Sequence, residues 1–443
     1  TTGASNVAVG VQSLFANTTG AANVSVGKEA MLANTTGGSN VAIGQDTMKA
    51  NTTASNNTAV GQNSLSANTT GASNVAVGKD SLKLNTTANN NTSVGKSALD
   101  ANTTGASLVA MGSNALGANT TAADNTAIGA FSLDSNTTGA QNTAVGRSAL
   151  DANTTASQNT AVGSCALLAN TTGTQNTAVG NVALDANTTG SYITAIGQCA
   201  LGANTTGEQH TAVGQGALQN NTTGDFNVAV GVSGLFTNTT GDNNTGVGQC
   251  VLFSNTTADN NTAVGMKAMC SNTTGHSNVA IGRLALKANT TADDNSAVGY
   301  LALNQNTTGA SNTAVGANAL ICNTTGFGNV AIGCGALDTN TTGEVNVAIG
   351  CRSMDANTSG NCNTFVGKDA GLSNTTGGSN SGFGIKAGEN VTTGGGNVFL
   401  GFESGAQGGM INITSEDNRF VAGHSGITNS YVKVDWTVTS DLR

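Results

Sequence analysis

The sequence predicts an all-β protein, a parallel β-solenoid in the form of a narrow β-roll with about 24 coils of 17 residues. Glycine recurs at every seventeenth position from Gly10 to Gly401, without one insertion or deletion. The three residues before it alternate β-branched, small and β-branched, as in residues 41–43, and an Asn-Thr-Thr corner follows. Stacked coils require a fixed period because a slip would displace every core side chain.

Two apolar rows are expected to form the core. The β-branched residues before each Gly suit a short strand, which Gly44 ends with a bend in the specimen coil. Four residues after each Gly, from Leu14 as far as Met354, comes Leu or Met. We expect both rows to point into the coil, giving a structural core that includes Val9, Leu14, Val26, Ile43, Leu65, Leu99, Leu150, Leu167, Leu184 and Leu201.

The remaining positions of a coil divide into small and polar rows. Charged residues gather one, two and five positions after the Gly, and these sites are expected to face water. Positions three and six are usually Ala or Ser, as at Ala149 and Ala152, and suit close packing of coil walls or of sister chains. Seventeen residues suffice for two short strands and two turns.

The Asn-Thr-Thr segment predicts a corner, because Asn and the following Gly are turn formers. Identical amides stacked at about 4.8 Å can hydrogen-bond from coil to coil. The expected corner ladder begins with Asn17, Asn34, Asn51, Asn68, Asn85 and Asn102. The same segment is also a glycosylation sequon. We favour the ladder, because a glycan on every coil would crowd its neighbours.

Composition excludes several functions. The net charge is −9 and the 15 Lys and Arg are scattered singly, so no nucleic-acid partner is expected. No apolar run is long enough for membrane insertion. No residues stand at the spacing of an acid–base pair or a metal site, so we expect no enzyme turnover, cofactor or metal.

Isolated His and Cys residues carry little chemistry. His210, His276 and His424 lack neighbouring ligands and are expected to be ordinary surface residues. Cys334 and Cys351 share a phase in adjacent coils, which leaves a disulfide between them open.

Aromatic residues are scarce, at 3% of the chain, and mark a candidate surface contact. Phe236 and Phe253 share a surface phase in adjacent coils, and Phe226 lies at a corner nearby. Such a patch could bind a partner or a saccharide, or it could form a local contact between chains. Both alternatives stay open.

The recurring Asn-x-Ala-Val/Ile-Gly segment resembles the left-handed parallel β-roll of trimeric autotransporter adhesin heads, over residues 1–405. The resemblance implies left-handed coils and a homotrimer. A thin core also favours lateral association, for which the alanine rows are suited. The 17-residue period and the Asn-Thr-Thr-Gly corner depart from those heads.

Residues 406–443 form a separate C-terminal cap or junction. The closing segment, with Trp436 and residues 440–443, resembles the junction before the self-cleaving intramolecular chaperone of phage tail fibres, the endosialidase type. The resemblance implies that Ser440 is the nucleophile of a single self-cleavage, with a Lys five residues on that would fall beyond Arg443. The alternative is that Ser440 belongs to ordinary solvated chain.

These features predict the shaft of a homotrimeric phage or virus tail fibre, extracellular on the virion surface, that presents contacts to a host receptor or glycan. The alternatives are an adhesin on a bacterial cell surface and a purely structural extracellular filament. Because the chain opens in mid-repeat at Thr1, we expect further repeats or an attachment domain upstream.

Overall fold

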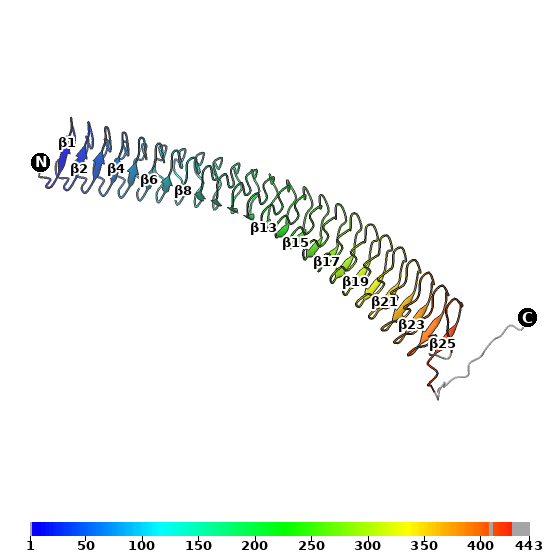
Figure 1. Cartoon of the computed structure of the whole chain (residues 1–443). Coiled ribbons are helices and arrows are strands. Elements are labelled where there is room, and N and C mark those ends of the chain that lie inside the picture. The colour runs from blue at the N-terminus through cyan, green and yellow to red at the C-terminus, as the bar shows by residue number, and fades with distance from the viewer. Residues whose placement is uncertain (1, 407–410, 428–443) are drawn as a thin grey trace, which may run out of the picture. The chain divides into compact units, whose positions relative to one another are not determined.

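The structure is a computed structural model that describes residues 2–406 and 411–427. It confirms an all-β parallel β-solenoid whose coils are 17 residues long, each with one strand of three residues (Figure 1). The chain divides between Asn261 and Thr262 into two compact units, and both repeat the same coil plan. Within the described ranges, no helix is long and apolar enough to cross a bilayer.

The first unit contains β1 (Val7–Val9), β2 (Val24–Val26), β3 (Val41–Ile43), β4 (Thr58–Val60), β5 (Val75–Val77), β6 (Thr92–Val94), β7 (Val109–Met111), β8 (Thr126–Ile128), β9 (Thr143–Val145), β10 (Thr160–Val162), β11 (Thr177–Val179), β12 (Thr194–Ile196), β13 (Thr211–Val213), β14 (Val228–Val230) and β15 (Thr245–Val247). The second contains β16 (Thr262–Val264), β17 (Val279–Ile281), β18 (Ser296–Val298), β19 (Thr313–Val315), β20 (Val330–Ile332), β21 (Val347–Ile349), β22 (Thr364–Val366), β23 (Ser381–Phe383), β24 (Val398–Leu400) and β25 (Phe420–Ala422).

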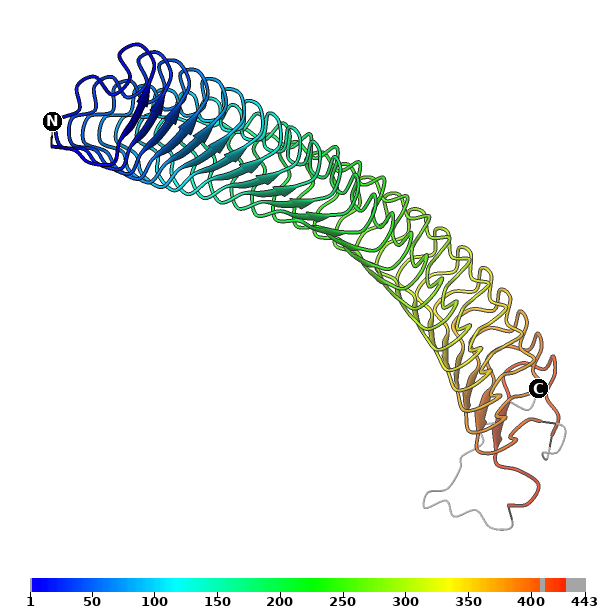
Figure 2. The same ribbon diagram turned by 60° about the vertical axis from the view of Figure 1, so that its left-hand side comes forward.

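Strands pair in parallel with the residue one coil further on. In the first unit Thr160 pairs with Thr177 and Val162 with Val179, and the strands stack along one side of the coils (Figure 2). In the second unit the last pair joins Val398 to Phe420, a spacing of 22 residues. Pairing therefore extends past residue 405, where the sequence repeat ends. Ser440 and Trp436 lie outside the described residues.

The core contains the Leu row but not the Val/Ile row. Leu65, Leu99, Leu150, Leu167, Leu184 and Leu201 are fully buried, as predicted. Leu14 is half-buried, because it lies in the first coil, which has a neighbour on one side only. The prediction is wrong for Val9 and Ile43, which are 57% and 41% exposed, and for Val26, which is half-buried.

The middle residue of each strand points inward instead. Ala42 is fully buried between its two outward neighbours, and the strand alternates as expected for an extended chain. The Met48 side chain, also fully buried, comes from another part of the same coil. Leu or Met at that position fills a thin interior, and the facing strand has room for little more than a Cβ atom.

Each coil has one strand rather than the predicted two. After the strand-ending Gly, residues two and four positions on adopt left-handed backbone, with φ 54° at Asp46 and 47° at Met48. The Asn51 N–H donates to the Met48 carbonyl at 3.1 Å, which closes a turn. Left-handed residues cannot continue a strand. Coils are joined here by bonds such as Met48 N–H to Ser64 O at 3.0 Å.

The invariant Gly has two physical causes. Gly44 has φ 137°, a region that is nearly restricted to glycine. A Cβ there would also stand 2.6 Å from the Gly61 carbonyl oxygen of the next coil. Both constraints recur at other strand-ending glycines, such as Gly163 and Gly333, so these positions admit no side chain.

Candidate functional site: ladders, an apolar row and a pocket

The corner ladder is present as predicted. Asn34 Nδ2 donates to Asn17 Oδ1 at 3.0 Å, and Asn51 Nδ2 donates to Asn34 Oδ1 at 2.9 Å. The bonds continue through Asn68, Asn85 and Asn102 at 2.9, 2.9 and 3.1 Å. Each amide also donates to a carbonyl three residues ahead, as from Asn34 to Gly37 O. The ladder therefore pairs corner backbone that lies away from water.

Burial of the ladder argues against glycosylation of the sequons. Asn34 and Asn51 are fully buried, and both hydrogens of each amide are donated. A glycan would have to replace one of these hydrogens and occupy the packed interior. In the folded coils the Asn-Thr-Thr segment serves as a ladder, the alternative that the sequence favoured.

A second Asn row lies four residues before the strand-ending Gly. The Asn57 N–H donates to Asn40 Oδ1 at 3.0 Å, and Asn40 Nδ2 donates to Ala54 O at 2.9 Å. An Oδ1 in this row accepts a backbone N–H of the next coil, and in some coils it also accepts the next amide, as from Asn329 Nδ2 to Asn312 Oδ1 at 3.1 Å. In the first unit Leu108, Ile193 and His210 replace its Asn.

The third residue of each strand forms an exposed apolar row. We call this set, from Val9 to Val247 in the first unit and from Val264 to Leu400 in the second, the apolar row. Ile43, Ile128 and Ile196 are 41%, 39% and 39% exposed. The row contains no charged residue, and the outward side chains of the first strand position are Val, Thr, Ser or Phe. An uncharged ribbon of sheet therefore faces outward in both units.

The alanine rows are less available to a sister chain than predicted. Ala149, three positions after its Gly, is fully buried inside the coil. Ala152, six positions after, is half-buried. The first of the two rows packs the coil wall and cannot reach another molecule.

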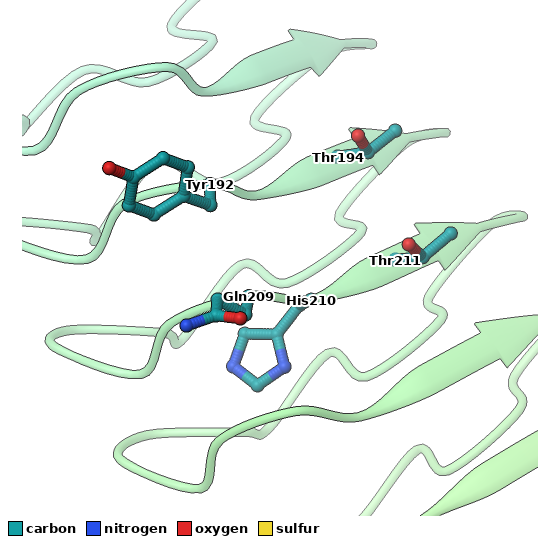
Figure 3. A pocket seen from close by; sticks show the side chains of 5 residues that line it. All are labelled: Tyr192, Thr194, Gln209, His210 and Thr211. Carbon is teal, nitrogen blue, oxygen red and sulfur yellow. The ribbon is translucent and has the colours of Figure 1, made fainter.

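A pocket of about 460 Å³ opens beside the first position of β12 and β13 (Figure 3). We call it the Tyr192 pocket. Tyr192 is 58% exposed, and its ring lies beside the chain segment that leads into β12. The other lining residues are Thr194, Gln209, His210 and Thr211.

His210 is a buried member of this site, not the surface residue that was predicted. It is 2% exposed, and its ring replaces an Asn of the second row. Its Nδ1 accepts the Asn227 N–H at 3.2 Å, as an Asn Oδ1 does in other coils. Burial lowers the pKa of His210 to about 4, against smaller opposing effects of Asp225 and of hydrogen bonds with Gly224 and Asn227. The imidazole is therefore neutral at physiological pH.

The predicted aromatic patch is only partly assembled. Phe236 and Phe253 stack with ring centroids 5.2 Å apart and planes 5° apart, and both are half-buried. Phe226 is exposed in another row, the row of Tyr192 and two coils further on. The Tyr192 pocket was not predicted. Its signal in the sequence is the replacement of Asn by Ile193 and His210 in consecutive coils.

Other candidate groups remain separate. Cys334 and Cys351 are free and exposed thiols. Residues 2–406 and 411–427 contain no group of three or more His, Cys, Asp or Glu side chains placed to hold a metal ion. Neither a protein-family model nor a curated protein matches this chain.

Proposed function

We propose that this chain is the shaft of a homotrimeric phage or virus tail fibre, extracellular on the virion surface, that holds host contacts away from the particle. The observation that carries the proposal is the apolar row. A solenoid that contacts no other chain is expected to carry polar side chains at its exposed strand positions. The exposed, uncharged Val/Ile row on successive coils therefore indicates a contact surface. Three such rows meeting along a common axis would be removed from water.

The magnitude of this burial is sufficient for association. Burying a Val or Ile side chain completely contributes about 1.5–3 kcal/mol. About two fifths of each such side chain in the row is still exposed, so burying that part would contribute about 0.6–1.2 kcal/mol for each coil. Over β1–β15 the gain is about 9–18 kcal/mol for each chain, against an association cost of about 4–15 kcal/mol. Strands of the second unit add to the gain. The apolar row thus replaces the alanine rows as the proposed contact.

The assignment to a tail fibre is supported by the resemblance of residues 440–443 to a self-cleaving junction, with Ser440 as the proposed nucleophile. A homotrimer presents each host contact three times, so weak contacts with a receptor or glycan gain in effective concentration. A bacterial surface adhesin remains the second candidate, because it would use the same exposed residues to contact a cell.

Antibody labelling of intact particles tests the fibre assignment. An antibody raised against this chain is expected to decorate appendages of virions in electron micrographs. Label on a bacterial envelope, with unlabelled virions, would replace the fibre with the adhesin. Continuous filaments of the purified chain would favour the structural filament.

The role of the apolar row is tested by charge variants. In three adjacent coils, Val145→Glu, Val162→Glu and Val179→Glu are expected to convert the trimer to monomers in sedimentation velocity, because buried unpaired carboxylates are costly. The matched control adds the same charge to the same coils at the exposed residues Gln141, Gln158 and Gln175. Far-UV circular dichroism checks folding. A monomeric parent chain, or equal effects of both triple variants, would refute the contact.

A further inference from the structure

The Tyr192 pocket has the chemistry of a saccharide site. An exposed tyrosine ring offers an apolar face and a hydroxyl, and Thr194 and Thr211 offer two further hydroxyls at the start of neighbouring strands (Figure 3). The Gln209 amide supplies both a donor and an acceptor. A volume of about 460 Å³ can hold one or two sugar rings.

The repeat is broken under this pocket. In a regular coil the backbone N–H of the second-row residue donates to the amide oxygen of the preceding Asn, as Asn159 does to Asn142 at 3.0 Å. Ile193 offers no such oxygen to the His210 N–H. Leu108 interrupts the row elsewhere, but only here do two consecutive coils depart from Asn.

The Tyr192 side chain is a further departure, on a backbone conformation that recurs in this row. The Tyr192 backbone is left-handed with φ 62°, a conformation that suits Asn, Asp or Gly and is unfavourable for a bulky side chain. In this row most other coils carry a small or polar residue such as Ser39, Asn56 or Gln175, and Phe226 is a second aromatic residue two coils further on. A large aromatic residue thus stands on the surface at a position where neither packing nor backbone conformation favours it, which is typical of a contact residue.

The charge around the pocket selects among sugars. Its five lining side chains are uncharged, since the buried imidazole is neutral. Glu208 and Asp225 lie beside them, and the Glu208 N–H donates to Asp225 Oδ1 at 2.8 Å. These carboxylates disfavour an anionic ligand.

We propose that the Tyr192 pocket binds a neutral hexose unit of a cell-surface glycan, with the Tyr192 ring against the sugar and the Thr194, Gln209 and Thr211 side chains on its hydroxyls. The role of this site as a host contact rests on the proposed fibre function. Its ability to bind a sugar depends only on the residues that line it.

Saturation-transfer NMR on the full chain provides the test, with methyl glycosides of glucose, galactose and mannose as probes and sialic acid as the anionic comparison. At least one neutral glycoside is expected to bind with a millimolar Kd, typical of a single exposed sugar site. Tyr192→Ser, which places a residue common in this row, is expected to weaken that binding at least about tenfold.

The matched control is Tyr300→Ser, because Tyr300 is also exposed, at 47%, and lies in another row. Circular dichroism of both variants checks that the coils are intact. The proposal is overturned if no neutral glycoside binds, if Tyr192→Ser binds as the parent does, if Tyr300→Ser weakens binding equally, or if sialic acid binds more tightly. If the chain binds a neutral sugar but the antibody does not label virions, the fibre assignment is wrong and the sugar site is still supported.

Discussion

Replacing one Asn of the corner ladder tests how the coils are held together. Asn153 Nδ2 donates to Asn136 Oδ1 at 2.9 Å and to Ala156 O at 3.0 Å, and Asn153 Oδ1 accepts from Asn170 Nδ2 at 3.0 Å. Asn153→Val leaves the Asn136 oxygen and one Asn170 N–H buried without partners. Ala156 O keeps a bond from Asn142.

Replacing an Asn should lower the free energy of unfolding by different amounts in the two rows. Each buried polar group without a partner costs about 1–3 kcal/mol, and the added methyl groups offset about 1 kcal/mol. We therefore expect Asn153→Val to lower the free energy of unfolding by about 1–5 kcal/mol. Asn159→Val leaves only the Asn176 N–H unpaired, because Gly173 O still accepts from Asn170, so its effect should be smaller, about 0–2 kcal/mol.

Urea unfolding followed by far-UV circular dichroism measures both variants. Thr155→Val, an exposed change in the same coil, is the control and should shift stability by less than about 0.5 kcal/mol. The ladder argument fails if Asn153→Val is no more destabilising than Thr155→Val, or less so than Asn159→Val. The chain carries a natural counterpart: Val391 ends the ladder, and the buried Asn374 Oδ1 has no hydrogen-bond partner.

Four further variants test the strand, the strand-ending glycine and the buried histidine. Ala161→Leu should destabilise the chain by about 1–3 kcal/mol, because a larger side chain overpacks the interior. Val162→Ala should cost less than about 1 kcal/mol in the monomer, because Val162 points outward. If urea unfolding showed Val162→Ala to be the more destabilising change, the Val side chains would belong to the core, as the sequence predicted. Gly163→Ala brings a Cβ to 2.3 Å from Gly180 O, and a thermal midpoint equal to that of the parent would contradict the close approach. The pKa of His210, about 4 in the folded chain, lies below the unfolded value near 6.5, so the unfolded chain binds more protons between these values. Stability relative to His210→Asn should therefore fall by up to about 3 kcal/mol as pH drops from 7 to 4, and parallel pH profiles of the two chains would show that the imidazole is not buried neutral.

The sequence was sufficient for the period, the Leu row and the corner ladder, because each depends on a residue type that recurs in one phase. It was insufficient to predict which side chains of the strand face the interior. Residues 41–43 alternate, and alternation is equally compatible with Ala42 inward or with Val41 and Ile43 inward. Hydrophobicity favoured the second arrangement. The structure has Ala42 inward, because the Met48 side chain already fills the interior. Met48 reaches the interior because Asp46 and Met48 adopt left-handed backbone.

The site was harder to predict for a related reason. His210 differs from Asn in type, and an isolated His suggests solvent exposure. In the coil its two ring nitrogens occupy the places of the amide atoms, so the substitution keeps the hydrogen-bonding pattern of the row. The 17-residue period places Ile193 and His210 in consecutive coils, and the structure adds that both are buried next to the exposed Tyr192.

The register of 17 residues also bears on how such a chain changes over generations. Because each coil bonds only to the coils before and after it, one whole coil can be gained or lost without disturbing the strands, the Leu row or the ladders of the rest. Nearly identical repeats in a gene recombine readily by unequal exchange. Length would then vary in discrete steps of about 4.8 Å, each adding one more Val or Ile to the apolar row.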